Sequence, residues 1–397
     1  MDTITTEDAH AIPFLKKLPV VIEKGQGVYV WDQSGRKYVD FTGGWGVTSI
    51  GHANPVLAEA IATQSRTILQ TPSSGLVYSP VRAALLAKMA DILPRNLARV
   101  FFANSGAEAN DAVIKLARKI SKRLDVISMT QSFHGRTIST ASATGQLKHR
   151  EKYNPLMPNY RFVPFNDLDA MAETIDDNVA AVLLEPIQGE GGVVIPSEDY
   201  LKGVSELCRK HGVFLIVDEV QTGFCRTGPM FAVNRYDVPV DFMTMAKGIG
   251  GGFPFAAFAV SQAVADKVEI GDHGGTYCGN PLGCAAALAV ITYLIENNIE
   301  AHVTEMGKAV MKRLDTFAKG RTDIITDVRG RGLLIAIEFK DGSAAEAVYR
   351  TCLANGLFVN LTQGRIVRLF PALNITRDEI AEGLNIFETT VDQVVGA

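Results

Sequence analysis

The chain has 397 residues, which at about 150 residues per domain predicts two or three domains. Its hydrophobic (47%) and charged (21%) fractions are those of an ordinary globular protein, and a net charge of −4 gives no support for nucleic-acid binding. Five cysteines without a CxxC pair exclude a disulfide scaffold and argue against a zinc ribbon.

The N-terminal sequence, MDTITTEDAH, is acidic and has no apolar core, so we expect no signal peptide. Segments 28–32 and 36–41, joined by Gln33-Ser-Gly35, predict a β-hairpin. The longest apolar run, 281–295, falls short of the roughly 20 residues that span a bilayer and predicts a buried helix. The sequence therefore predicts a cytoplasmic protein with no membrane partner.

The middle of the chain alternates short apolar runs with amphipathic stretches. The runs predict strands buried on both faces, at 99–103, 125–129, 180–184, 214–217 and 241–246. The stretches 107–122 and 197–211, the second closed by Gly212, predict helices. This alternation predicts an α/β fold with a mostly parallel sheet and helices on both faces.

The pattern changes after residue 296. Helices are predicted at 300–319, at 344–355 and from Thr376, with two short strands in 323–339 around Arg329-Gly-Arg-Gly332. This predicts a smaller α+β domain, against which the N-terminal hairpin is expected to pack. The predicted division is an N-terminal segment (1–45), a large domain (46–295) and a C-terminal small domain (296–397).

Several common motifs are missing from the sequence. It contains no Walker A loop, no GxGxxG fingerprint, no GxSxG elbow and no HExxH pair. The seven histidines are scattered without zinc-ligand spacing, so no metal site is predicted. The remaining candidates are five polar loops beyond predicted strand ends, where open α/β sheets bind ligands.

The first two loops have residues suited to an anion and to a flat ring. Residues 104–109 follow a strand and open a helix, so bare N–H groups and a positive dipole end are available to a phosphate, although Ser105 is also an ordinary N-cap. Residues 132–136 place Phe133 beside Arg136, a combination that stacks a ring and pairs a carboxylate. A surface loop with a buried Phe is the alternative.

The other three loops carry charged side chains. Glu190 lies among three glycines in 185–192 and is either functional or simply solvated. Asp218 ends a buried strand and needs a partner, either a structural Arg or a cationic ring nitrogen. Lys247 ends another strand before a glycine cluster, where desolvation would make its amine nucleophilic. An anion cradle, an aromatic face, a buried Asp and a nucleophilic Lys together match the requirements of pyridoxal phosphate.

The chain resembles the class III (ω-amino) aminotransferases of fold type I, in the acetylornithine, ornithine and 4-aminobutyrate branch. The resemblance extends over nearly the whole length and rests on motifs in this order: Gly25 to Phe41, Gly51-His52 with Asn54-Pro55, FFANSGAEAN, SFHGRT, EPIQGEGGV, DEVQTGFCRTG, AKGIGGGFP and HGGTYCGNPLGC.

The resemblance implies how pyridoxal phosphate is held. Lys247 would form its Schiff base and shuttle the proton, and Asp218 would keep the ring nitrogen protonated. The remaining cofactor residues implied are Ser105, Gly106 and Ala107 at the phosphate, Phe133 and Val220 on the ring faces, and Gln221 near the ring hydroxyl. Thr276 matches a position that reaches the phosphate from the neighbouring subunit, which implies a homodimer.

The resemblance also implies a substrate site. Arg136 would bind the carboxylate far from the reacting amine, and Arg368 would bind the α-carboxylate of glutamate or 2-oxoglutarate. Glu190 would pair with Arg368 while the ω-amino donor is bound. Trp45 departs from the small aliphatic residue usual in this branch, and either reshapes the donor pocket or packs in the core.

The predicted reaction is ping-pong amino transfer from an ω-amino compound to 2-oxoglutarate. An aminomutase, racemase or decarboxylase on the same fold, or an amine:pyruvate transaminase, remains an alternative because fold does not fix reaction. A binding protein without catalysis is disfavoured by Lys247 and Asp218. The sequence does not name the amino donor.

Overall fold

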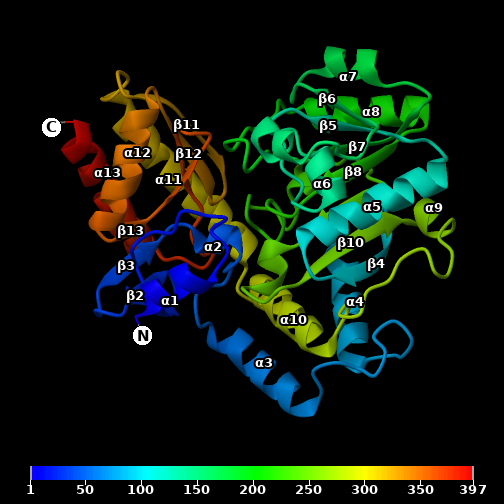
Figure 1. Ribbon diagram of the computed structural model, residues 1–397, viewed down its shortest axis with the longest axis horizontal. Coiled ribbons are helices and arrows are strands. Elements are labelled where there is room, and N and C mark those ends of the chain that lie inside the picture. The colour runs from blue at the N-terminus through cyan, green and yellow to red at the C-terminus, as the bar shows by residue number, and fades with distance from the viewer. Residues whose placement is uncertain (1, 396–397) are drawn as a thin grey trace.

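The computed structural model describes residues 2–395 and has two lobes (Figure 1). The larger lobe contains a seven-stranded sheet in the order β4-β10-β9-β8-β7-β5-β6. Its strands are β4 (Leu97–Ala103), β5 (Asp125–Met129), β6 (Tyr160–Val163), β7 (Val179–Leu184), β8 (Phe214–Asp218), β9 (Phe242–Met245) and β10 (Ala256–Ser261). Its helices are α3 (Pro55–Thr67), α4 (Pro80–Ile92), α5 (Gly106–Ser121), α6 (Ile138–Ala143), α7 (Leu168–Thr174), α8 (Tyr200–His211), α9 (Gln262–Ala265) and α10 (Pro281–Glu296), with short 3-10 turns η1 (Leu147–His149), η2 (Glu151–Tyr153), η3 (Ala232–Arg235) and η4 (Lys247–Gly250).

The seven-stranded sheet is mostly parallel, as predicted. Strands β6, β5, β7, β8 and β9 run in one direction, and β10 is antiparallel to both β9 and β4. Strands β6 and β10 were not predicted. The direction of β10 follows from the connection before it. The chain returns from Met245 to Ala256 through η4 alone, and so short a connection cannot make the crossover that a parallel neighbour needs. The carboxyl ends of β5, β7, β8 and β9 therefore share one edge of the sheet.

The smaller lobe combines both ends of the chain (Figure 1). One antiparallel sheet has the order β11-β12-β15-β14, and a second has the order β1-β2-β3-β13, in which β3 pairs in parallel with β13. The elements are α1 (Thr3–His10), β1 (Ile22–Gln26), β2 (Tyr29–Asp32), β3 (Lys37–Asp40), α2 (Gly43–Gly46), α11 (Ile299–Lys319), β11 (Ile325–Arg331), β12 (Leu334–Phe339), α12 (Gly342–Ala354), β13 (Leu357–Phe358), β14 (Asn360–Thr362), β15 (Ile366–Leu369) and α13 (Arg377–Val395).

Two predicted boundaries are wrong. Helix α8 begins at Tyr200 rather than Ser197, because the backbone N–H and hydroxyl of Ser197 donate to Asn166 Oδ1 and hold that residue in a turn. Arg329 to Arg331 lie inside β11 rather than between strands, and the reversal falls at Gly332. The predicted end of α8 at Gly212 is confirmed, with a left-handed φ of 61°.

Helix α10 is largely buried, packs against α3 and α4 and carries an almost wholly apolar sequence, as predicted for 281–295. Within residues 2–395, no single helix is long and apolar enough to cross a membrane. The bent pair α10 and α11 passes that test together, by length and composition.

Candidate functional site

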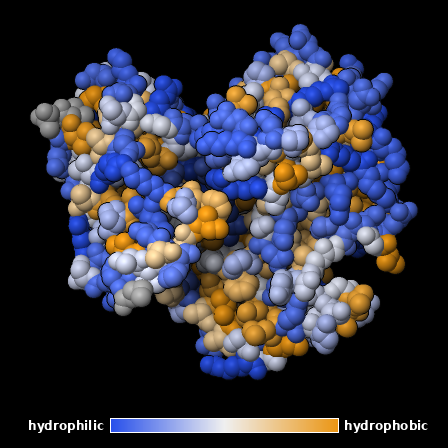
Figure 2. Space-filling model, in the orientation of Figure 1, coloured by the Kyte–Doolittle hydropathy of each residue, from blue (hydrophilic) through white to orange (hydrophobic). Residues whose placement is uncertain are grey.

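A cavity of about 430 Å³ opens at the carboxyl edge of the seven-stranded sheet. The molecular surface is hollowed between the two lobes (Figure 2). Ten of the predicted site residues line the cavity: Ser105, Gly106, Ala107, Phe133, Arg136, Glu190, Asp218, Val220, Gln221 and Lys247. Residues far apart in the sequence thus meet because their strands end at one edge.

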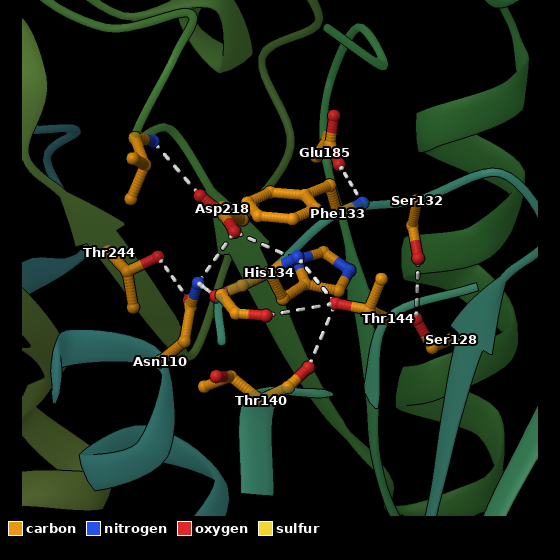
Figure 3. A network of polar contacts seen from close by, with 12 residues as sticks. Asn110, Ser128, Ser132, Phe133, His134, Thr140, Thr144, Glu185, Asp218 and Thr244 are labelled. Atoms are coloured by element: carbon orange, nitrogen blue, oxygen red, sulfur yellow. Dashed lines mark hydrogen bonds and ion pairs between the residues drawn. The ribbon is translucent and has the colours of Figure 1, made fainter. Parts of the chain in front are cut away.

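Asp218 lies at the end of β8 and is buried at the floor of the cavity. Its Oδ2 atom accepts hydrogen bonds from Asn110 Nδ2 (2.7 Å) and His134 Nδ1 (2.8 Å), and its Oδ1 atom accepts one from the backbone N–H of Val220 (3.0 Å) (Figure 3). No arginine pairs with Asp218 in the part of the chain that the structure describes. The structural alternative of an Arg partner is therefore wrong.

The partners of Asp218 are themselves fixed. Asn110 Nδ2 also donates to the carbonyl of His134 (2.9 Å), and Thr244 donates to Asn110 Oδ1 (2.7 Å) (Figure 3). The backbone N–H of His134 donates to Thr144 (3.0 Å). Nε2 of His134 is buried with no hydrogen-bond partner among the described residues, so the side-chain contact of the ring with this network is made through Nδ1. This network holds the Asp218 carboxylate in one orientation.

The first turn of α5, where the sequence predicts an anion cradle, lies at the cavity. Ser105 caps the helix by accepting from the backbone N–H of Glu108, and the Glu108 side chain returns to the Ser105 backbone in a capping box. The backbone N–H groups of Gly106 and Ala107 find no acceptor within residues 2–395 and lie at the cavity. A Cβ atom at position 106 would lie 2.9 Å from Val220 Cγ1, so this position needs glycine. The helix start thus combines an N-cap with two free donors.

Lys247 follows β9 at the start of η4 and has a left-handed φ of 47°, which is uncommon for a residue with a side chain. Its Nζ atom has no hydrogen bond or ion pair with another described residue, and the side chain lines the cavity. Burial lowers the pKa of Lys247, and Arg368 lowers it further, although Glu190 and Asp218 oppose the shift. A lysine with these properties is a candidate nucleophile.

Arg368 lies on β15 and is fully buried behind Glu190. Its Nη2 atom lies 2.8 Å from Glu190 Oε1, and its Nη1 atom donates to the carbonyl of Gly189 (2.8 Å). Burial raises the pKa of Glu190, but the charges of Arg368 and Lys247 outweigh burial and lower this pKa to about 2. Glu190 is therefore ionised at neutral pH and separates Arg368 from the cavity.

The remaining predicted residues lie outside this central group or are exposed. Trp45 is 53% exposed, so core packing is wrong, and the cavity is lined by Val47 from the same segment instead. Thr276 is exposed and does not line the cavity of its own chain. Arg136 is exposed, with its guanidinium 5.8 Å from the ring centre of Phe133.

Sequence reasoning missed four buried polar residues that complete the site: Asn110, His134, Glu185 and Thr244. Glu185 accepts from the backbone N–H groups of Phe133 and Gly189, both at 2.8 Å, and burial raises its pKa to about 7. His134 adjoins Phe133 in the FHGR segment, which was a usable signal. Asn110 and Thr244 looked like ordinary helix and strand residues.

Comparison with known proteins identifies the family. A profile described as "Aminotransferase class-III" matches residues 14–391. An acetylornithine aminotransferase of Methanothermobacter thermautotrophicus is 44% identical over 93% of both chains, and a succinylornithine transaminase of Salmonella agona is 38% identical over 98% of this chain and 96% of its own. The chain belongs to the class-III aminotransferases.

Solved structures agree with this family and its fold. An ornithine aminotransferase of Toxoplasma gondii superposes with a TM-score of 0.94 at 32% identity, over 99% of this chain and 95% of its own. Another structure of that enzyme carries partially occupied pyridoxal phosphate at its active site. This class-III aminotransferase has fold type I, as predicted, and its cofactor is pyridoxal 5′-phosphate.

The cavity of this aminotransferase fits that cofactor. The two free N–H donors of Gly106 and Ala107 suit a phosphate, and position 106 has no room for a Cβ atom. Asp218 offers a buried, fully oriented carboxylate, and Lys247 offers an unpaired amine in the same cavity. The described residues contain no cluster of three or more side chains suited to a metal ion.

Proposed function

We propose that this enzyme transfers the ω-amino group of acetylornithine, or of a closely similar N-acylated ω-amino acid, to 2-oxoglutarate in two half-reactions. The observation that carries the acceptor is the buried Arg368 held behind Glu190 at the cavity. Likeness to the acetylornithine aminotransferases supports the donor. The enzyme is proposed to act in the cytoplasm.

The proposed roles follow from the positions of the side chains. When bound, pyridoxal phosphate supplies an aldehyde that condenses with amines and a ring that accepts electrons. Lys247 is the proposed Schiff-base lysine, and its amine moves the proton at the reacting carbon of the substrate. Asp218 holds a proton on the ring nitrogen, while His134 and Asn110 orient the Asp218 carboxylate.

The other cofactor contacts are proposed in the same way. Ser105, Gly106 and Ala107 bind the phosphate, Phe133 and Val220 flank the ring, and Gln221 lies towards the ring hydroxyl. All of these residues line the cavity. Each contributes binding or orientation rather than proton transfer.

Two arginines are proposed to bind the carboxylates of the substrates. Arg136, exposed beside Phe133, binds the α-carboxylate of the donor, far from its reacting amine. Arg368 binds the α-carboxylate of 2-oxoglutarate after Glu190 moves aside. Because the pKa of Glu190 is about 2, this exchange is a movement of a charged carboxylate rather than a protonation. Trp45 is proposed to act at the donor side of the entrance.

A homodimer is proposed as the active unit, with Thr276 contributing to the partner's phosphate site. Large exposed apolar side chains support this proposal: Leu69 (53%), Leu76 (85%), Tyr78 (101%) and Tyr277 (64%). The carbonyl of Thr276 accepts from Gln70 (2.6 Å) and Ser74 (2.8 Å), which ties the two loops together. Light scattering of the purified holoenzyme should give a dimer mass or a multiple of it, and a monomer would contradict the proposal.

A substrate panel tests the reaction. Acetylornithine, succinylornithine, ornithine and 4-aminobutyrate are each combined with 2-oxoglutarate and with pyruvate, and the amino acid product is measured. We expect glutamate to form fastest from acetylornithine, and none to form with Lys247→Ala. Lys202→Ala, an exposed lysine on α8, is the matched control. Turnover of the donors with pyruvate but not with 2-oxoglutarate, or full turnover by Lys247→Ala, would overturn the proposal.

A further inference from the structure

Asn360 lies directly across the small-lobe sheet from Arg368. The two residues are register partners in the antiparallel pair β14 and β15. The side-chain oxygen Oδ1 of Asn360 accepts from Arg368 Nε at 2.9 Å and from Arg368 Nη2 at 2.6 Å. These two bonds occupy the inner edge of the guanidinium, and neither involves a charged partner.

The outer end of the same guanidinium has a different environment. Nη1 donates to the carbonyl of Gly189 (2.8 Å), and Nη2 also lies 2.8 Å from Glu190 Oε1. The side chain of Glu190 is 28% exposed, whereas the side chain of Arg368 is fully buried. Glu190 lines the cavity and is the charged partner, so we take it as the one that a substrate carboxylate can replace. The Gly189 carbonyl and Gln221 Oε1, which lies 3.5 Å from Nη1, are neutral.

The presence or absence of a charge at position 360 decides how strongly Arg368 attracts a substrate carboxylate. Within the described residues, Glu190 is the carboxylate within ion-pair distance of Arg368. A second carboxylate at position 360 would remain beside the guanidinium whether or not Glu190 moved, and would offset its charge. A neutral amide orients Arg368 and leaves that charge for the substrate.

We propose that Asn360 is a positioning residue for substrate selection: it holds Arg368 by a neutral contact so that the outer end of the guanidinium exchanges Glu190 for the carboxylate of the 2-oxo acid. This inference rests on the proposed function of Arg368. Asn360 acts through Arg368 and has no contact of its own with the reacting atoms.

The test compares Asn360→Asp and Asn360→Ala holoenzymes with the wild type. Calorimetry measures the binding of glutarate, a dicarboxylate that lacks the reacting carbonyl group, and stopped-flow absorbance measures the two half-reactions separately. Asn355→Asp is the matched control, because Asn355 lies in the same lobe and bonds Thr390 and Gln393 instead.

We expect Asn360→Asp to weaken glutarate binding by about tenfold or more, the scale of one charge-assisted hydrogen bond. The acceptor half-reaction should slow correspondingly, through a higher half-saturating 2-oxoglutarate concentration, while the half-reaction with acetylornithine changes by less than about threefold. Asn360→Ala should be milder than Asn360→Asp, because it adds no competing charge.

A merely structural role predicts the opposite order, since Asp keeps the shape and acceptor oxygens of Asn whereas Ala loses them. That order, or equal losses in both half-reactions, would overturn the inference about Asn360 alone. A wild-type enzyme that binds neither glutarate nor 2-oxoglutarate would overturn the proposed function as well.

Discussion

Removing the charge of Glu190 should change which substrates the enzyme selects. The pKa of Glu190 is lowered from 4.5 to about 2, and at about 1.4 kcal/mol per unit the ionised side chain is favoured by about 3 kcal/mol in its place beside Arg368. A substrate carboxylate has to displace this interaction. Glu190→Gln keeps the shape of the side chain and loses most of that competition.

We expect Glu190→Gln to bind glutarate more tightly and to react faster with glutamate, by between about tenfold and a ceiling of about a hundredfold. The ratio of kcat/KM for acetylornithine to that for glutamate should fall at least about tenfold. Stopped-flow half-reactions and calorimetry measure both quantities, with the exposed Glu198→Gln as the control. An unchanged ratio would refute the idea that Glu190 controls access to Arg368.

Three further outcomes are expected. Arg368→Lys should impair the 2-oxoglutarate half-reaction more than the amine half-reaction, and equal losses in single-turnover rates would count against the exchange with Glu190. Gly106→Ala should weaken cofactor binding, measured by dialysis and absorbance, because its Cβ atom would lie 2.9 Å from Val220 Cγ1. The control Gly320→Ala should bind the cofactor normally, because its Cβ atom would lie no closer than 3.9 Å to another residue. Burial raises the pKa of Glu219 to about 7, so the contribution of this carboxyl to stability falls as the pH rises from about 4.5 to 7, where the unfolded state ionises first. The Tm of Glu219→Gln should therefore gain on that of the wild type between pH 5 and pH 8, unlike the Tm of Glu198→Gln.

The periodicity of the sequence was sufficient for most of the large-lobe sheet. The segments 180–184 and 214–217 are largely buried, and this condition appears directly in the sequence as an unbroken apolar run. The segment 125–129 is also buried, although Asp125 and Ser128 interrupt its apolar residues. Strand β10 was not predicted because its alanine-rich run follows a glycine cluster without an intervening α-helix. Its antiparallel direction depends on the length of the preceding connection.

The candidate site divides in a similar way. Residues next to glycine clusters and strand ends, such as Asp218 and Lys247, were recognisable because burying a charged side chain at the end of a strand costs free energy. Asn110 and Thr244 were not, since an amide and a hydroxyl occur in any helix or strand. Their role is visible only where α5 crosses β9 and brings both side chains together.

The sequence by itself determined the class of fold, the family and the candidate side chains for the cofactor, because short-range patterns record which residues are buried and where backbone must be bare. Tertiary structure alone decided the partners of those side chains. Arg368 and Glu190 are 178 residues apart in the sequence, and Asn360 is opposite Arg368 only through strand register. Such distances depend on how β15 packs over the loop after β7, which no local pattern contains.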